Sequence, residues 1–188
     1  LVKEYKGINS IFVLNSQGIA VSGASSKGEN FIGNNYGDRA YFKPIMQGKD
    51  VIDPNIIVAK TTKKEILVIG TPVLGENGKP IGAFCVTINW LEYIKNHILN
   101  ITFAEHGYAF IIDANGRFIA HPNPDLHMND VSEVEFVKKA LKLKQGSFNY
   151  EFLGRNKVLV FNTVERTGWL VCTSAFEDDL ARDAIAQR

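Results

Sequence analysis

The chain has 188 residues, of which 45% are hydrophobic and 22% charged, so its composition excludes disordered and low-complexity proteins. Lysine and arginine total 21 against 20 aspartates and glutamates, and this formal charge of +1 excludes the strongly basic surface typical of nucleic-acid-binding proteins. No apolar run reaches the roughly 18 residues of a membrane-spanning helix, and the start LVKEYKG lacks the layout of a signal peptide. We therefore expect a soluble piece cut from a longer membrane protein.

Two similar segments divide the chain into halves. Residues 11–22 (IFVLNSQGIAVS) and 109–120 (AFIIDANGRFIA) each read as an apolar strand, a polar turn that ends in glycine, and a second strand. Gly18 and Gly116 suit such turns because glycine takes a positive φ without a Cβ clash. The sequence predicts a β-hairpin at the start of each half.

A short helix and three strands are predicted after the first hairpin. The helical stretch is DRAYFKPIMQGK at 38–49, and a turn at 76–79 joins the last two strands. The three strands are expected at 51–60, 65–74 and 80–88. The following segment, 89–103, has apolar residues at helical spacing, which predicts a helix that links the halves.

The second half repeats this order. A helix is predicted over 132–145, where Ser132 and Glu135 have the spacing of a capping box. Strands are expected near 146–152, 157–164 and 168–175. The pattern predicts an α+β chain of two tandem modules, each a five-stranded antiparallel sheet with helices and loops on one face.

Several segments together resemble the double Cache domain. They include GDRAYFKPIMQGK, GTPVLGENGKPIGAF, HGYAFIIDANGRFIAHPNPDL and TGWLVCTSAFEDDL, and the resemblance covers essentially the whole chain. In that family two PAS-like modules form the ligand-sensing part of bacterial chemoreceptors and sensor kinases, outside the membrane. The resemblance implies the end of a long N-terminal helix at 1–7, a membrane-distal ligand-binding module at 8–89, a linking helix at 90–103, a membrane-proximal module at 104–176, and a C-terminal helix toward the membrane at 177–188.

The resemblance also implies a function. We expect a non-catalytic, extracytoplasmic sensor domain of a methyl-accepting chemotaxis receptor, which is anchored in the cell membrane and forms a homodimer. Its expected partner is a small-molecule ligand, without a cofactor or nucleic acid. A histidine kinase or a cyclic-dinucleotide enzyme as the output, or a relay module without a ligand, are alternatives that these residues leave open.

Arg39 is the first candidate for ligand binding. Its guanidinium offers a planar fork of donors that suits a carboxylate, although pairing with a surface acid is the alternative. Tyr41 follows, and its phenol can cover an apolar ligand and still donate a hydrogen bond, unless it packs in the core. Asn34 and Tyr36 in the preceding loop are further candidates, or they only form a turn.

The pattern carried by amino-acid-sensing members of the family is incomplete here. Arg39 and the aromatic Tyr41 match it, but Asn34 stands where those members have a tyrosine. A tyrosine and two aspartates of the pattern are replaced on the third and fifth strands by Ile57, Ala59 and Thr87. With Cys85, these residues would form an apolar wall, and Asp53 is the nearest spare acid.

A buried ammonium group needs a carboxylate or a π-face to offset its lost hydration. The resemblance therefore implies a ligand that is a carboxylate without an amino group, or a neutral polar molecule, rather than an amino acid.

The remaining reactive residue types suggest no chemistry. Cys85 and Cys172 lie in apolar strands of different halves and are expected to be reduced and buried. The four histidines have no metal-ligand spacing, so no metal site is expected at His97, His106, His121 or His127. A solvated face is expected for Lys60, Lys63 and Lys64. Nucleophile and phosphate-loop motifs are missing, so no catalytic residue is predicted.

Overall fold

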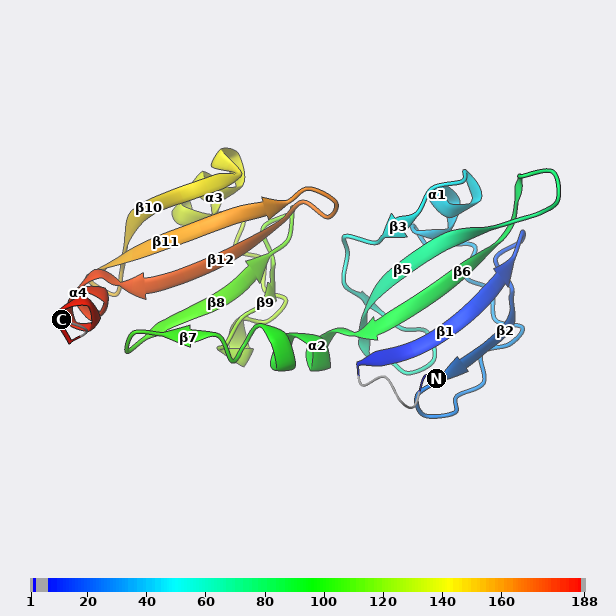
Figure 1. Cartoon of the computed structure of the whole chain (residues 1–188), viewed down its shortest axis with the longest axis horizontal. Helices are drawn as coiled ribbons and strands as arrows, with labels where there is room; N and C mark the ends of the chain where they lie inside the picture. The colour runs from blue at the N-terminus through cyan, green and yellow to red at the C-terminus, as the bar shows by residue number, and fades with distance from the viewer. Residues whose placement is uncertain (1, 3–6, 187–188) are drawn as a thin grey trace. The chain divides into compact units, whose positions relative to one another are not determined.

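The computed structural model describes residues 2 and 7–186, and it divides into two compact units, Leu1–Tyr93 and Ile94–Arg188. Each unit contains a six-stranded antiparallel sheet (Figure 1). The predicted α+β class and tandem modules are confirmed, but each sheet has one strand more than expected. The helix end expected at 1–7 lies largely outside the described residues.

The first sheet has the strand order β2-β1-β6-β5-β3, and β4 pairs with β5. Its elements are β1 (Ile8–Asn15), β2 (Ala20–Ser25), α1 (Phe42–Met46), β3 (Val51–Ile52), β4 (Ile57–Val58), β5 (Glu65–Leu74) and β6 (Pro80–Asn89). Ile66 and Val68 alternate with more exposed neighbours along β5, as expected for a strand with one buried face. Phe42 and Ile45 of α1 pack on this face in the core.

Two predicted elements of the first half are shorter than expected. The strand expected at 51–60 is split into β3 and β4 by a turn in which Asp53 Oδ1 accepts a hydrogen bond of 3.0 Å from Asn55 N. The helix expected at 38–49 is reduced to the five residues of α1. The split strand accounts for the sixth strand of the first sheet.

The second sheet has the order β10-β11-β12-β8-β7, and β9 pairs with β8. Its strands are β7 (Thr102–Phe103), β8 (Gly107–Ile112), β9 (Phe118–Ala120), β10 (Gln145–Phe152), β11 (Arg155–Val164) and β12 (Trp169–Phe176). The helices of this unit are the 3-10 helix η1 (Pro124–Leu126), α3 (Glu135–Leu143) and α4 (Glu177–Ala186). Val137 and Ala140 attach α3 to the core.

The helix between the halves, α2 (Trp90–His97), ends before the predicted residue 103. Trp90 and Ile94 are buried, but Ile101 is exposed and Thr102–Phe103 pair with β8 as the extra strand β7. The predicted capping box of Ser132 and Glu135 is also wrong. The N-cap residue of α3 is Val134, whose side chain cannot cap the helix, and the backbone N–H of Ser132 donates to Asp130 Oδ1 in the preceding loop.

The internal repeat extends beyond the hairpins. Tyr36 N donates a 2.8 Å hydrogen bond to Gly18 O, and Val131 N donates one of the same length to Gly116 O. The hairpin therefore holds the following loop in the same way in both units.

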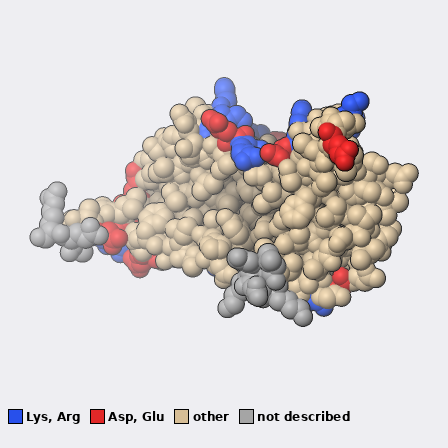
Figure 2. Space-filling model, turned by 45° about the vertical axis from the view of Figure 1, so that its right-hand side comes forward, with Lys and Arg blue, Asp and Glu red and all other residues tan. Residues whose placement is uncertain are grey.

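The distribution of charged side chains on the surface agrees with the near-equal numbers of basic and acidic residues. On the face drawn in Figure 2, lysine and arginine side chains are interspersed with aspartate and glutamate. Among the described residues, no helix has the length and apolar character needed to cross a membrane.

Candidate ligand-binding site

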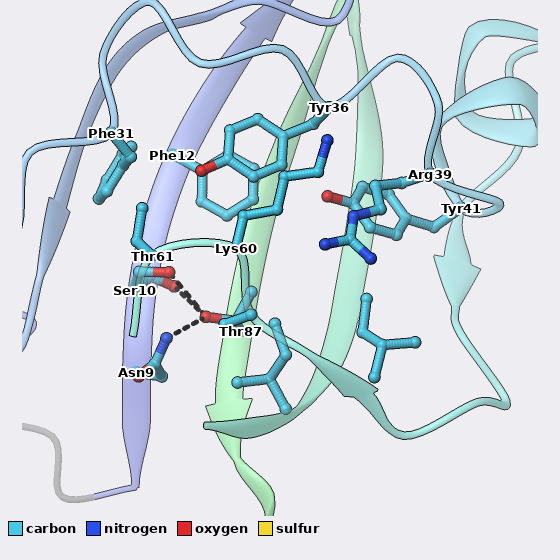
Figure 3. A pocket seen from close by; sticks show the side chains of 13 residues that line it. Asn9, Ser10, Phe12, Phe31, Tyr36, Arg39, Tyr41, Lys60, Thr61 and Thr87 are labelled. Atoms are coloured by element: carbon cyan, nitrogen blue, oxygen red, sulfur yellow. Dashed lines mark hydrogen bonds between the residues drawn. The ribbon is translucent and has the colours of Figure 1, made fainter. Parts of the chain in front are cut away.

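The first unit contains a small pocket between the inner face of its sheet and the loop that covers it (Figure 3). Its volume of about 20 Å³ is room for about one water molecule. Residues from β1, β5 and β6, from the loop before α1, and from the segment around β4 line the pocket: Asn9, Ser10, Phe12, Phe31, Tyr36, Arg39, Tyr41, Ile57, Ala59, Lys60, Thr61, Ile66 and Thr87.

One end of the pocket has a polar floor. Thr87 Oγ1 lies 2.7 Å from Ser10 Oγ and 3.2 Å from Asn9 Nδ2, and these bonds are drawn in Figure 3. Asn9 is 3% exposed, and its Oδ1 has no hydrogen-bond partner among the described residues. An unsatisfied buried acceptor costs about 1–3 kcal/mol, so a ligand donor that reached this oxygen would be favourable.

The other end of the pocket is cationic. Arg39 Nη2 donates to Val58 O at 3.3 Å, and Figure 3 places Arg39 at the opposite end from Asn9. Lys60 extends across the pocket, and its Nζ lies 2.7 Å from both Asn35 O and Asp38 Oδ1. The hydrogen bond from Lys60 lowers the pKa of the Asp38 carboxyl.

The contact between Lys60 and Asp38 is easily exchanged. The two side chains are 33% and 68% exposed, and exposed ion pairs contribute only about 0–1 kcal/mol. A ligand carboxylate can therefore replace Asp38 at Lys60 with little loss of stability.

Aromatic rings form the walls of the pocket. Tyr36 stacks on Phe12 with ring centroids 5.3 Å apart, and Phe31 meets Phe12 edge-on at 5.6 Å. Tyr41 is buried, and burial raises the pKa of its phenol, so the hydroxyl stays protonated and available as a donor.

The structure brings together six of the nine residues proposed from the sequence. Arg39 and Thr87 line the pocket together with Tyr36, Tyr41, Ile57 and Ala59. Their contact with a ligand remains a prediction.

The other three candidates lie outside the pocket lining. Asn34 is exposed, and its carbonyl accepts a hydrogen bond from Ala20 N as part of the loop. Both hydrogen bonds of Asp53 Oδ1 come from Asn55. Cys85 is buried in the core, and burial raises the pKa of its thiol to about 12. As predicted, Cys85 and Cys172 are both free and buried.

Sequence reasoning missed several polar residues of the site, among them Asn9, Ser10 and Lys60. The strand alternation of β1 would have placed Ser10 beside Phe12, but Asn9 is also buried because the register of β1 with β6 shifts between Ile8 and Ser10. Lys60 was expected on a solvated face, whereas it lines the pocket. No sequence signal indicates that its ammonium group would reach the loop at 35–38.

A separate charged cluster lies at the start of α4. Glu105, His106 and Asp179 place ligand-type atoms within 4.8 Å of one another. Asp179 Oδ2 is 2.8 Å from His106 Nδ1, and its Oδ1 binds Arg155 at 3.0 Å and also Arg182. Burial alone would raise the pKa of Asp179, but the bonds from His106 and Arg182 outweigh burial and lower it. Two guanidinium groups therefore neutralise this carboxylate, and the cluster serves as an ion-pair network.

Comparison with known proteins identifies the family. The family model dCache_1, a Cache domain, matches residues 1–184. The chain belongs to the Cache domain family. Among curated relatives, methyl-accepting chemotaxis protein McpA of Bacillus subtilis strain 168 is 28% identical over 152 residues, which cover 79% of this chain and 22% of McpA. The chain thus spans about a fifth of the length of that relative.

Solved structures share the fold. The extracellular domain assigned to a histidine kinase, mmHK1S-Z3, has a TM-score of 0.78 at 16% identity, and the match covers 100% of this chain and 79% of that one. The ligand-binding domain of the Pseudomonas aeruginosa PAO1 amino acid chemoreceptor PctB, in complex with L-Arg, has a TM-score of 0.64 at 16% identity and covers 92% and 73%.

Proposed function

We propose that this Cache domain is the extracytoplasmic sensor of a transmembrane methyl-accepting chemotaxis receptor, and that it binds a small molecule in the pocket of its first unit. Family membership and the chemotaxis relative McpA support this role. The first unit would be the membrane-distal module, and the receptor would be a homodimer anchored in the cell membrane, with α4 leading toward the bilayer. A histidine kinase as the output is the second candidate, favoured by the fold of mmHK1S-Z3.

The ligand is a small carboxylate without an amino group. The observation that carries this proposal is the charge of the pocket: Arg39 and Lys60 line it, whereas no aspartate or glutamate does so among the described residues. PctB binds L-Arg, but an ammonium group entering this pocket would lose several kcal/mol of hydration without meeting a carboxylate. A carboxylate avoids that loss and pairs with the guanidinium of Arg39.

A hydroxyl group on the same ligand would complete the site. The carboxylate would bind Arg39 and displace Asp38 from Lys60, while a hydroxyl at the other end would donate to Asn9 Oδ1. Since the pocket of about 20 Å³ is too small for such a molecule, binding requires Lys60 and the loop to move outward. Binding would thus favour an open arrangement of the first unit, by no more than its differential affinity for that state.

A thermal-shift panel tests this function. Lactate, pyruvate, propionate and succinate are compared with the neutral lactamide and propionamide, on the wild type, on Arg39→Ala, and on Lys43→Ala as a control that removes an exposed charge of α1. A ligand at a hundred times its dissociation constant stabilises by about 2.7 kcal/mol. We expect at least one acid to stabilise the wild type and Lys43→Ala but not Arg39→Ala. A panel without any shift, or shifts that persist in Arg39→Ala, would overturn the proposal.

A further inference from the structure

The second unit has a much larger cavity than the first, of about 390 Å³. This volume falls in the range of about 300–1,000 Å³ typical of small-molecule sites. Six aromatic side chains surround it: Tyr108, Phe110, Phe118, Phe136, Tyr150 and Phe152. Phe136 and Tyr150 stack with ring centroids 4.6 Å apart, so the cavity has flat apolar walls.

The cavity occupies the position of the first pocket in the internal repeat. Ser10 pairs with Thr87 across β1 and β6, and Tyr108 pairs with Ser174 across β8 and β12. Phe110 lies two residues after Tyr108, as Phe12 lies two residues after Ser10.

Two further lining positions correspond. Tyr36 and Val131 are the residues whose N–H groups bond to the glycines of the two hairpins, and each lines the pocket of its own unit. Near one edge of each sheet, Ile57 of β4 pairs with Ile66 of β5 in the first unit, and Tyr150 of β10 pairs with Lys157 of β11 in the second. Lys157 therefore stands where the first unit has Ile66.

The charge beneath this cavity is positive. Lys157 is 1% exposed, and Nζ lies 3.2 Å from Tyr108 Oη, 4.4 Å from the centroid of the Tyr108 ring and 5.3 Å from that of Phe152. Among the described residues Lys157 has no carboxylate within ion-pair distance. The rings of Tyr108 and Phe152, which line the cavity, thus lie between the cavity and the buried ammonium group of Lys157.

Two polar side chains that line the cavity, Tyr108 and His121, each offer a hydrogen-bond donor. Tyr108 Oη accepts the bond from Lys157, which leaves its own hydrogen free for a ligand. His121 Nδ1 accepts a 3.0 Å bond from Asn123 N, so the ring carries its proton on Nε2. Burial lowers the pKa of His121 and raises that of Tyr108 to about 12, which keeps both side chains neutral donors. No acidic residue lines this cavity among the described residues.

We propose that the second unit holds a ligand site of its own, which binds a small aromatic carboxylate. The ring lies between the aromatic walls, and the carboxylate accepts hydrogen bonds from Tyr108 and His121 above the charge of Lys157. This site is independent of the ligand proposed for the first unit.

Fluorine NMR of 4-fluorobenzoate tests the site, with 4-fluorobenzamide as the neutral analogue of the same shape. We expect the wild type to bind 4-fluorobenzoate with a dissociation constant below about 1 mM, and the amide at least about tenfold more weakly. Lys157→Met should remove this preference for the acid. Arg39→Ala, which removes the first site, should bind the acid as the wild type does.

A blocking variant locates the binding. Val134 lines the cavity but is exposed, so Val134→Trp fills the entrance without disturbing the core, and it should abolish binding. Circular dichroism checks its fold, and Leu126→Trp replaces it if it is unfolded. The proposal is overturned if the wild type does not bind the acid, if the folded blocking variant still binds it, if the amide binds equally well, or if Arg39→Ala loses binding.

Discussion

At the scale of single residues, our proposal gives Thr87 the main part in selecting the ligand of the first pocket, which it lines. Its hydroxyl joins Asn9 and Ser10 in a neutral floor, at the place where amino-acid-sensing relatives are expected to carry an acid. A neutral floor can form hydrogen bonds with hydroxyl and amide groups, but it supplies no negative charge to offset the dehydration of an ammonium group. The identity of this one residue therefore gives a direct test of ligand class.

Thr87→Asp should convert the pocket toward amino acids. We expect the ligand-free variant to lose about 1–3 kcal/mol of unfolding free energy, because the new carboxylate is buried without a cationic partner at this end of the pocket. Alanine should then raise the Tm of the variant, although it leaves the wild type unchanged. The matched control is Thr87→Asn, which has the same shape without the charge. An equal response of the two variants to alanine would show that charge at this position does not select the ligand.

At the scale of elements, each hairpin turn fixes the loop that covers a pocket. Gly18 has a φ of +79°, and a Cβ at this position would lie 2.4 Å from Gly37 Cα. The loop that follows Gly37 carries Arg39 and Tyr41, so the position of the turn affects two residues that line the first pocket. Any side chain on Gly18 would push this loop away from the sheet.

Gly18→Ala should therefore destabilise the first unit more than the positive φ alone explains. Gly28→Ala is the matched control, because Gly28 has the same φ of +79° and nothing within 4 Å of an added Cβ. The φ strain costs about 1–2 kcal/mol in both variants, and the clash adds about 1–3 kcal/mol in Gly18→Ala only. Urea denaturation measures the difference. Equal losses would mean that the loop yields without resistance.

The helix α4 is held to the second sheet by the ion-pair network of Asp179. Asp179→Asn should speed hydrogen exchange of the α4 amides several-fold at neutral pH, because Arg155, Arg182 and His106 lose their shared carboxylate. Asp178→Asn, which removes an exposed carboxylate bound by Arg155 alone, should change the exchange much less. Similar exchange in the two variants would argue that packing, not Asp179, holds the helix.

The pH dependence of this network follows from the lowered pKa of Asp179. A carboxyl whose pKa is lower in the folded than in the unfolded state stabilises the protein above its ordinary value of 3.8, and this stabilisation is lost as the pH falls through the folded-state pKa. The α4 amides of the wild type should thus keep their slower exchange, relative to those of Asp179→Asn, until the pH falls below 3.8.

At the scale of the whole molecule, the repeat was the most reliable signal in the sequence. Hairpins, long strands and tandem modules follow from alternating apolar residues and turn glycines, which act locally. The helix predicted to reach residue 103 failed because the spacing of Ile98 and Ile101 does not reveal that residues 102–103 pair with β8. Pairing of this kind depends on contacts made only in the folded chain.

The candidate site could be predicted only in part for the same reason. Arg39, Tyr41 and Thr87 followed from the resemblance to a family, whereas Asn9 depends on a strand irregularity and Lys60 on a contact with a distant loop. The cavity of the second unit was not foreseen, although its lining residues occupy repeat positions equivalent to those of the first pocket.

The central claim is that the first pocket binds a carboxylate and rejects the matching amino acid. Isothermal titration calorimetry of lactate and alanine, which differ by a hydroxyl in place of an ammonium group, measures this directly on the wild type. We predict heat and saturable binding with lactate, and none with alanine at millimolar concentration. Binding of alanine as tight as that of lactate, or tighter, would contradict the claim and would show that an acidic group outside the pocket lining, such as Asp53, reaches the ligand.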